Sequence, residues 1–199
     1  MTPSIKLVKR AAAPLAVGAM LSAAGIARAD DTIKHPGDHP DYHVEAEPHL
    51  VVAFDNVFGS DGFGVGGRFS IPIVQNGFIK GINNNVAIGF GLDFVHYSGF
   101  CHYRGYICDA TYFFIPVVMQ WNFFVAERWS VFGEPGFAIY HGFGFDSCPP
   151  GSGDCYDPHA TGFFPAVLFL GGRYHFSEAV ALTMRIGWPM FSIGVSFFP

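Results

Sequence analysis

Charged residues and long apolar runs are both scarce in this 199-residue chain. Asp, Glu, Lys and Arg together make up 14% of the residues, against about a quarter in ordinary soluble domains. After residue 29, no stretch approaches the roughly 18 consecutive apolar residues that a transmembrane helix requires. Yet half of the residues are hydrophobic, and Phe occurs 23 times. A chain this apolar, without helical spans, can cross a membrane only as a closed β-barrel, because only that arrangement satisfies every backbone group in lipid.

Basic residues are also few, and they are concentrated at the N-terminus. Residues 1–29 combine Lys6, Lys9 and Arg10 with an apolar stretch and end in Ala27-Arg28-Ala29, the three-part pattern of a cleaved secretory signal peptide. Cleavage would remove four of the 11 basic residues and none of the 16 acidic ones, which leaves a net charge of −9. Nucleic acid is therefore not an expected partner, because its binders carry basic patches.

Eight segments of the remaining chain alternate between large apolar residues and small or polar ones. A period of two places the two sets on opposite faces of a β-sheet. The segments are 44–54, 63–74, 85–96, 111–125, 130–140, 163–176, 180–188 and 191–199. The last is typical: Phe191, Ile193, Val195 and Phe197 share one face, and Ser192, Gly194 and Ser196 share the other.

Seven charged residues within these segments all lie on the face opposite the large aliphatic residues. They are Glu45, Glu47, Arg68, Asp93, Glu134, Arg173 and Arg185. The rest of that face is mainly Gly, Ala, Ser and Thr, which suits a narrow lumen better than a wet exterior. The sequence therefore predicts an all-β fold, an eight-stranded antiparallel up-and-down transmembrane β-barrel over residues 43–199. Its large apolar residues face lipid and its paired charges fill the lumen.

Two long connections, near residues 97–110 and 141–160, are expected on the same side of the barrel. If the N-terminus is periplasmic, they face outward, as long loops of such barrels do. Each contains two cysteines with six residues between them, Cys101 with Cys108 and Cys148 with Cys155. A secreted chain favours two local disulfides over a zinc site that uses all four thiolates. Candidate recognition residues in these connections are Phe100, Tyr103, Tyr106, Asp146, Asp154 and Asp157.

Residues 30–42 form a polar leader that contains histidine and proline. A cation site is conceivable from residues in and after it, which are His35, His39, His43, His49, Asp38 and Asp41. Their spacing matches no compact metal motif, so we favour a flexible, solvated periplasmic leader. We expect neither a metal nor a cofactor.

The stretches IPVVMQWNFF, GEPGFAIY and RYHFSEAVALTMRIGWPMFSIGVSFFP carry a family resemblance. With the signal and the eight alternating segments, they resemble the small outer-membrane β-barrel superfamily that includes the transmembrane domain of outer-membrane protein A. The resemblance implies a place in the bacterial outer membrane, among its lipid and lipopolysaccharide, and a charge cluster in the lumen. It also implies docking of the C-terminal strand on the barrel-assembly machinery.

Three functions are compatible with this pattern. We favour a non-enzymatic barrel that serves envelope structure or surface recognition through disulfide-pinned loops, with an unknown extracellular ligand. A narrow, porin-like channel for small solutes is the alternative, if the luminal charges exchange partners. A lipid A-modifying enzyme is the third, because His175 and Ser177 resemble the catalytic pair of barrel-shaped lipid A 3-O-deacylases. Against it, Glu178 stands where that family has Asn.

Overall fold

The computed structural model describes residues 32–54, 61–103, 106–144, 161–188 and 190–199, with the side chains of residues 99–108 left out. After a short 3₁₀ helix, η1 (Thr32–Lys34), eight strands follow one another along the chain. They are β1 (Glu45–Ala53), β2 (Gly62–Val74), β3 (Asn84–Tyr103), β4 (Tyr106–Ala126), β5 (Trp129–Gly144), β6 (Thr161–Ser177), β7 (Val180–Gly187) and β8 (Met190–Phe197). Within these ranges, no helix has the length and apolarity needed to cross a membrane.

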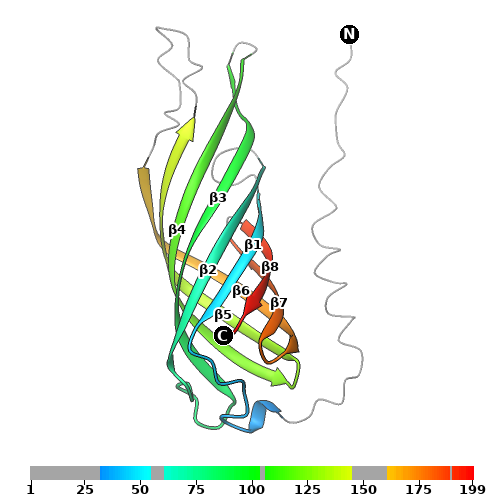
Figure 1. The fold of residues 1–199 in the computed structure, drawn as a ribbon. Helices are drawn as coiled ribbons and strands as arrows, with labels where there is room; N and C mark the ends of the chain where they lie inside the picture. Colours follow the sequence, from blue (N-terminus) through cyan, green and yellow to red (C-terminus); the bar gives the residue numbers. More distant parts are fainter. Residues whose placement is uncertain (1–31, 55–60, 104–105, 145–160, 189) are drawn as a thin grey trace, which may run out of the picture. The chain divides into compact units, whose positions relative to one another are not determined.

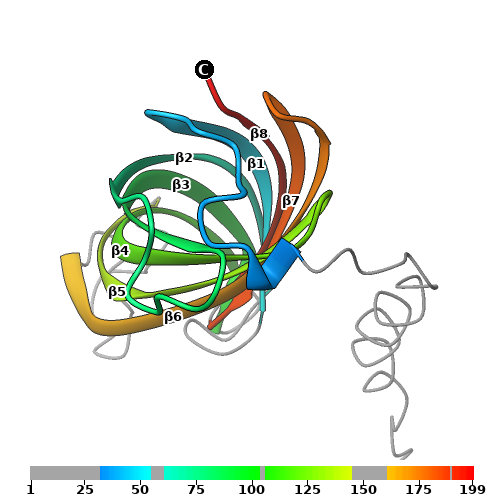
Figure 2. The ribbon, with the colours of Figure 1, turned by 90° about the horizontal axis from the view of Figure 1, so that it is seen from below.

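Each strand pairs antiparallel with its neighbour in sequence, and β1 pairs with β8 to close the barrel. The closing register runs from Ala46 opposite Phe197 to Ala53 opposite Met190. Figure 2 shows the strands as a ring. Closure leaves no sheet edge in the barrel wall, so every strand finds its hydrogen-bond partners within the barrel. The predicted eight-stranded antiparallel barrel is confirmed.

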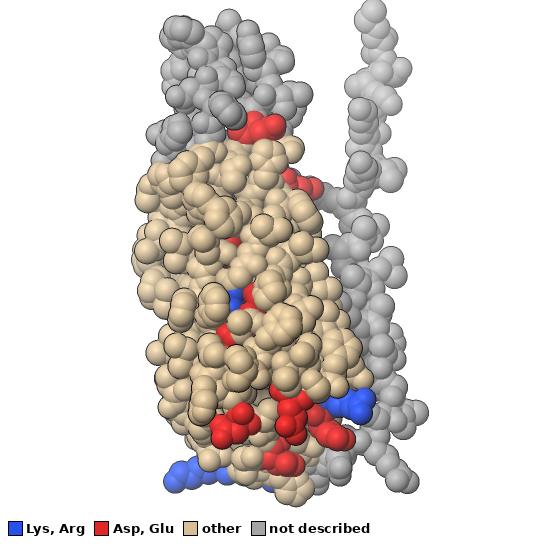
Figure 3. Space-filling model, in the orientation of Figure 1, with Lys and Arg blue, Asp and Glu red and all other residues tan. Residues whose placement is uncertain are grey.

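The large apolar residues of the predicted outer face point outward. Phe63, Val65, Phe69, Ile71 and Ile73 of β2 are between 46 and 59% exposed, although they belong to a well-ordered strand. The same holds along β3, where Ile88, Phe90, Leu92 and Phe94 are exposed. In Figure 3 the middle of the barrel surface is almost entirely uncharged, and charged side chains gather at its lower end. Such an exterior matches hydrocarbon rather than water.

The inner face is less uniformly small than the sequence predicted. Phe114, Phe132 and Phe169 point inward and are almost fully buried. Val86 is also fully buried, although it keeps the outward phase of Ile88 and Phe90. It lies opposite Trp121 on β4, and Phe78, from the connection between β2 and β3, packs edge-on against that indole with the ring centroids 5.7 Å apart.

The connection expected between the third and fourth strands is largely strand instead. β3 continues to Tyr103 and β4 begins at Tyr106, with Tyr103 opposite Tyr106 and Cys101 opposite Cys108. The predicted loop residues Phe100, Tyr103 and Tyr106 therefore belong to a long hairpin that rises above the barrel (Figure 1).

An arginine on the outer face of β3 should destabilise the barrel. Ile88 is 45% exposed in the fifth position of β3, where lipid would surround it. We expect Ile88→Arg to lower the free energy of unfolding by up to roughly 4 kcal/mol, since a charge that faces hydrocarbon is costly. Urea titration in lipid vesicles measures the change.

Phe78→Arg is the matched control, because Phe78 is 60% exposed but lies in a connection between strands. We expect it to change the free energy of unfolding little. Equal losses in the two variants would show that the outer face of β3 does not meet lipid.

Candidate functional site: the luminal charge network

The seven charged residues predicted for the lumen all lie in it, each only 1 to 3% exposed. They come from six strands: Glu45 and Glu47 from β1, Arg68 from β2, Asp93 from β3, Glu134 from β5, Arg173 from β6 and Arg185 from β7. Because inward positions of an eight-stranded barrel converge on one axis, residues far apart in the sequence meet there. Glu47 and Arg185, for example, are 138 residues apart.

Arg185 is the best-connected member of the network. Its guanidinium donates to both carboxylate oxygens of Glu47, from Nη1 at 2.8 Å and from Nη2 at 2.9 Å. Its Nε donates to Oε2 of Glu134 at 2.8 Å. Gln120 donates to the other oxygen of Glu134 at 2.9 Å. One cation thus bridges two acids from opposite walls with the fork geometry that suits arginine.

Arg173 forms a second pair with Glu45. Two nitrogens of the guanidinium, Nε and Nη2, donate to the two carboxylate oxygens at 3.0 and 2.8 Å. Nη1 donates to the amide oxygen of Asn122 at 2.6 Å, and the Ser196 hydroxyl donates to Glu45 at 2.7 Å. The ring of Phe132 lies beneath this guanidinium, 4.2 Å from its central carbon. A large inward aromatic residue therefore supports the cations through its π face.

Asp93 holds the third group together. Its Oδ2 accepts a hydrogen bond from Nη2 of Arg68 at 2.9 Å, and its Oδ1 lies 2.9 Å from Nε2 of His49. His49 also lies beside Glu47, which joins this group to Arg185. The sequence pattern indicated His49 only as a candidate cation ligand. Its parity with Glu47 was the signal for a luminal role.

Small residues on neighbouring strands make room for these large side chains. His49 has Gly66 of β2 on one side and Gly194 of β8 on the other. Arg68 lies opposite Gly91, and a Cβ at residue 91 would approach the Arg68 side chain to 2.5 Å. The many inward glycines thus have a packing cause, because side chains fill the interior of a barrel this narrow.

Apolar and aromatic residues close the lumen above the network. Their cluster includes Val51 and Ala53 from the end of β1, with Tyr97, Tyr112 and Phe169 from other strands. Tyr97 and Tyr112 meet edge to face, with ring centroids 5.8 Å apart. The charges are therefore shielded from water on the side of the long hairpin.

The leader lies against the opposite end of the barrel. The carbonyl of Ile33 accepts a hydrogen bond from the backbone of Asn83 at 2.7 Å, and the Asn83 side chain donates to the Asp38 carbonyl at 2.6 Å. His39 stacks on Phe124 of β4, with ring centroids 4.8 Å apart. Backbone carbonyls of the leader accept both of these hydrogen bonds, so its polar composition did not reveal them.

Tyr42 ends the leader inside the barrel. Its ring packs edge-on against Phe198, with centroids 4.9 Å apart, and only 4% of its surface is exposed. Burial, followed by the nearby Glu45 carboxylate, raises the pKa of Tyr42 to about 12. The tyrosine is therefore neutral at every physiological pH, and it adds no charge to the lumen.

The histidines and aspartates considered as cation ligands are not brought together. His39 contacts the Gln75 carbonyl, whereas His49 lies within the charge network. Among the described residues, no group of three His, Cys, Asp or Glu side chains is arranged to hold a metal ion.

The predicted serine and histidine pair is arranged differently from the expectation. His175 points into the lumen, and its Nε2 lies 3.0 Å from the hydroxyl of Ser130, not of Ser177. Ser130 is fully buried, and Nδ1 of His175 has no hydrogen-bond partner among the described residues. A nucleophile needs access to substrate and a base oriented by a third group, and neither condition is met at this pair.

The predicted surface residues are described only in part. Cys101 and Cys108 are directly opposite in the backbone register of β3 and β4, which is the placement that a local disulfide needs. Cys148, Cys155, Asp146, Asp154 and Asp157 lie outside the described residues. The two disulfides remain predictions.

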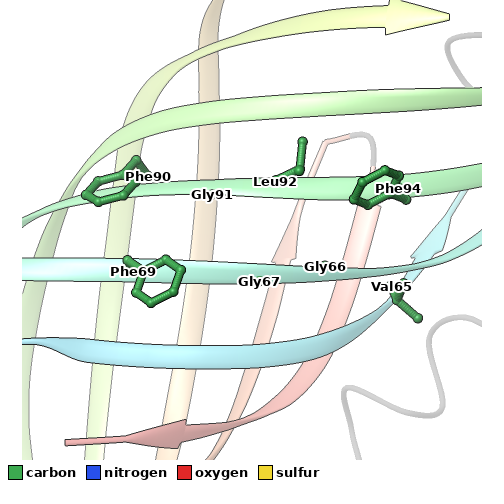
Figure 4. Close-up of a pocket in the computed structure, with 8 residues that line it drawn as sticks. All are labelled: Val65, Gly66, Gly67, Phe69, Phe90, Gly91, Leu92 and Phe94. Carbon is green, nitrogen blue, oxygen red and sulfur yellow. The ribbon is translucent and has the colours of Figure 1, made fainter. Parts of the chain in front are cut away.

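A shallow apolar groove of about 440 Å³ lies on the outer wall between β2 and β3 (Figure 4). Gly67 forms part of its floor, and the stacked rings of Phe69 and Phe90, with centroids 6.0 Å apart, border it. The side chains around it are the exposed apolar residues of the outer face. The groove is therefore separate from the luminal network.

Comparison with known proteins gives matches of structure alone. No family model matches the chain, and no curated protein does. A de novo designed transmembrane β-barrel is 14% identical with a TM-score of 0.40, and the match covers 83% of this chain and 98% of that one. The Yersinia pestis outer membrane protein Ail is 11% identical (TM-score 0.43; 79% and 99% covered), and Neisserial surface protein A is 13% identical (TM-score 0.44; 79% and 97% covered).

Adding a methyl group beside His49 should disturb the network. A Cβ at residue 66 would lie 2.3 Å from Oδ1 of Asp93 and 2.6 Å from Nε2 of His49. We expect Gly66→Ala to lower the free energy of unfolding by roughly 1 to 3 kcal/mol, the usual cost of overpacking. Gly67→Ala is the control, since the nearest atom to its Cβ is 3.9 Å away. Urea titration compares them, and an equal effect at both positions would contradict the packing argument.

Removing the central cation should lower the free energy of unfolding by more than Gly66→Ala does. Arg185→Ala leaves the carboxylates of Glu47 and Glu134 buried without their shared partner, so we expect a loss of about 3 to 5 kcal/mol in the free energy of unfolding. Arg128→Ala, in the solvent-exposed turn between β4 and β5, should change it little. A loss below 1 kcal/mol for Arg185→Ala would mean that the network contributes little to stability.

Proposed function

We propose that this chain is a non-enzymatic β-barrel of the bacterial outer membrane, whose lumen is a structural plug and whose long hairpin presents a recognition surface. The observation that carries the proposal is the inversion of polarity. Large apolar residues cover the outside, and the charged side chains of the strands are buried inside. A soluble barrel has the opposite arrangement, because water must solvate its exterior.

The lumen supports a plug better than a channel. A conducting path would have to pass the paired groups around Arg185 and Arg173, the aromatic cluster above them and the leader below. These layers lie across the barrel axis, and Arg173 and Arg185 in them are hydrogen-bonded to the facing carboxylates. In a barrel of eight strands, such filling is the default state.

The hairpin of β3 and β4 supports surface recognition. A strand needs about 9 to 11 residues to cross a membrane, whereas β3 has 20 residues and β4 has 21. The last residue of β3 paired with β2 is Tyr97, and beyond it, within the described part of the chain, β3 pairs only with β4. This ribbon rises above the rest of the barrel wall (Figure 1), where a ligand outside the cell could reach it.

The C-terminal strand supports docking on the barrel-assembly machinery. Phe191, Ile193, Val195 and Phe197 keep the outward phase, and Phe197 is 45% exposed. Phe198 turns inward, where it stacks near His175 and Tyr42. The outward aromatic series thus ends at Phe197, and the residue after it serves the inner packing.

Conductance measurements test the plug. We expect the purified protein to give no discrete openings in planar lipid bilayers, because the lumen is filled. Stable openings whose conductance changes in Arg173→Ala or Arg185→Ala would contradict a plug and favour the channel.

Epitope accessibility and binding test the surface role of the hairpin. A tag inserted between residues 104 and 105 should be labelled by antibody on intact cells, while a tag between Glu127 and Arg128 should need permeabilised cells. In nanodiscs, shortening the hairpin by residues 98–109 should abolish binding to an array of proteins and glycans. Retained binding by the shortened protein, or labelling of intact cells at the second tag, would overturn this part of the proposal.

A further inference from the structure

His49 occupies a prepared position in the barrel wall. It is 5% exposed, and its neighbours on the adjacent strands are Gly66 and Gly194. A Cβ at residue 194 would approach the Cβ of His49 to 2.5 Å, and one at residue 66 would approach Nε2 to 2.6 Å. Glycine at residue 66 therefore leaves space for the imidazole, and glycine at residue 194 leaves space for the backbone and Cβ of residue 49.

Both ring nitrogens of His49 face oxygen atoms. Nε2 lies 2.9 Å from Oδ1 of Asp93. Nδ1 lies 3.3 Å from the carbonyl oxygen of Glu47 and 3.4 Å from its Oε1. A neutral imidazole has one donor nitrogen and one acceptor nitrogen, so either tautomer would direct a lone pair at an oxygen. Only the imidazolium donates on both sides.

The charges of the lumen lead to the same conclusion independently. Four carboxylates, those of Glu45, Glu47, Asp93 and Glu134, are buried there with the guanidinium groups of Arg68, Arg173 and Arg185. Three cations cannot balance four anions, and an uncompensated charge in a dry interior is strongly unfavourable. A charged His49 makes the described network neutral.

We propose that His49 is a buried proton-binding site, and that the proton it holds is a required part of the luminal network. Asp93 of β3 and Glu47 of β1 are the anions that face the ring. Arg68 of β2 reaches it through Asp93, Arg185 of β7 reaches it through Glu47, and Glu134 of β5 lies beyond Arg185. On β8, the neighbour of the ring is Gly194, which has no charge. Loss of the proton leaves too few cations to balance Glu47 and Asp93. The stability of the folded barrel therefore depends on pH.

Nuclear magnetic resonance tests the protonation state directly. In the full-length protein, labelled with nitrogen-15 at histidine and held in detergent micelles, we expect both ring nitrogens of His49 to give the imidazolium signature at pH 8. Free histidine is mostly neutral at that pH, because its pKa is about 6.5. Spectra of His49→Gln assign the signal. A neutral tautomer of His49 at pH 7 would overturn the proposal.

Proton linkage supplies the second test. The unfolded chain releases this proton above pH 6.5 while the folded barrel keeps it, so raising the pH favours the unfolded state. Between pH 7 and 9, we expect the equilibrium constant for unfolding of the wild type to rise by up to tenfold per pH unit. His49→Gln should lack this component, because glutamine does not titrate.

His49→Lys is a second variant, which keeps the test decisive if His49→Gln does not fold. His49→Lys keeps a positive charge across this pH range, so its unfolding constant should also lack the wild-type slope. Equal slopes in the wild type and in whichever variant folds would overturn the proposal.

Discussion

The pairing of β1 with β8 is the interaction on which the rest of the structure depends. By joining the first strand to the last, it removes the two edges that an open eight-stranded sheet would expose. Once the wall is closed, its backbone polar groups are satisfied within it, and the outer face can be apolar throughout. Closure also creates a narrow interior from which water is largely excluded, and this interior sets the rules for the inward side chains.

In that interior, the charges must balance, and nearly every atom of the charged groups must find a hydrogen-bond partner. Arg185 donates hydrogen bonds to Glu47 and Glu134, and Arg173 donates to Glu45. Their fork-shaped guanidinium groups thereby meet this demand. Aromatic layers above and the leader below keep water from competing for the same groups. The two ends of the lumen therefore strengthen the electrostatic interactions in its middle by keeping water out, although the ends themselves carry few charges.

The faces of the strands could be predicted from the sequence, because a period of two assigns each residue to a side without knowledge of its partner. Phe63 and Arg68 illustrate this: their parity alone placed one outside and one inside. Parity does not say which residues meet across the lumen, so the contact between Glu45 and Arg173, 128 residues apart, could not be predicted. Nor does parity reveal that Val86, on the outward phase, is buried opposite Trp121, against which Phe78 from a neighbouring connection packs.

The long hairpin and the leader escaped prediction for a different reason. Glycine and serine near residue 98 indicate a turn, and pairing with β4 is irregular between Tyr97 and Cys101, yet it resumes at Cys101 and runs to Tyr103. In the leader, Ile33 and Asp38 contribute backbone carbonyls, which every residue type possesses. Contacts made by the backbone leave no pattern in the sequence.

The network has a value that stability alone does not explain. A buried ion pair is often no more stabilising than well-packed apolar residues of similar volume, so an apolar core could fill the lumen. A charged interior, however, penalises mistakes in strand register. A shift of one residue in β1 would exchange its two faces, and would carry Glu45, Glu47 and His49 into lipid while it brought Leu50 and Val52 inward. The glycines that face His49 would then face the wrong residues, so the same side chains that fill the barrel also define how its strands align.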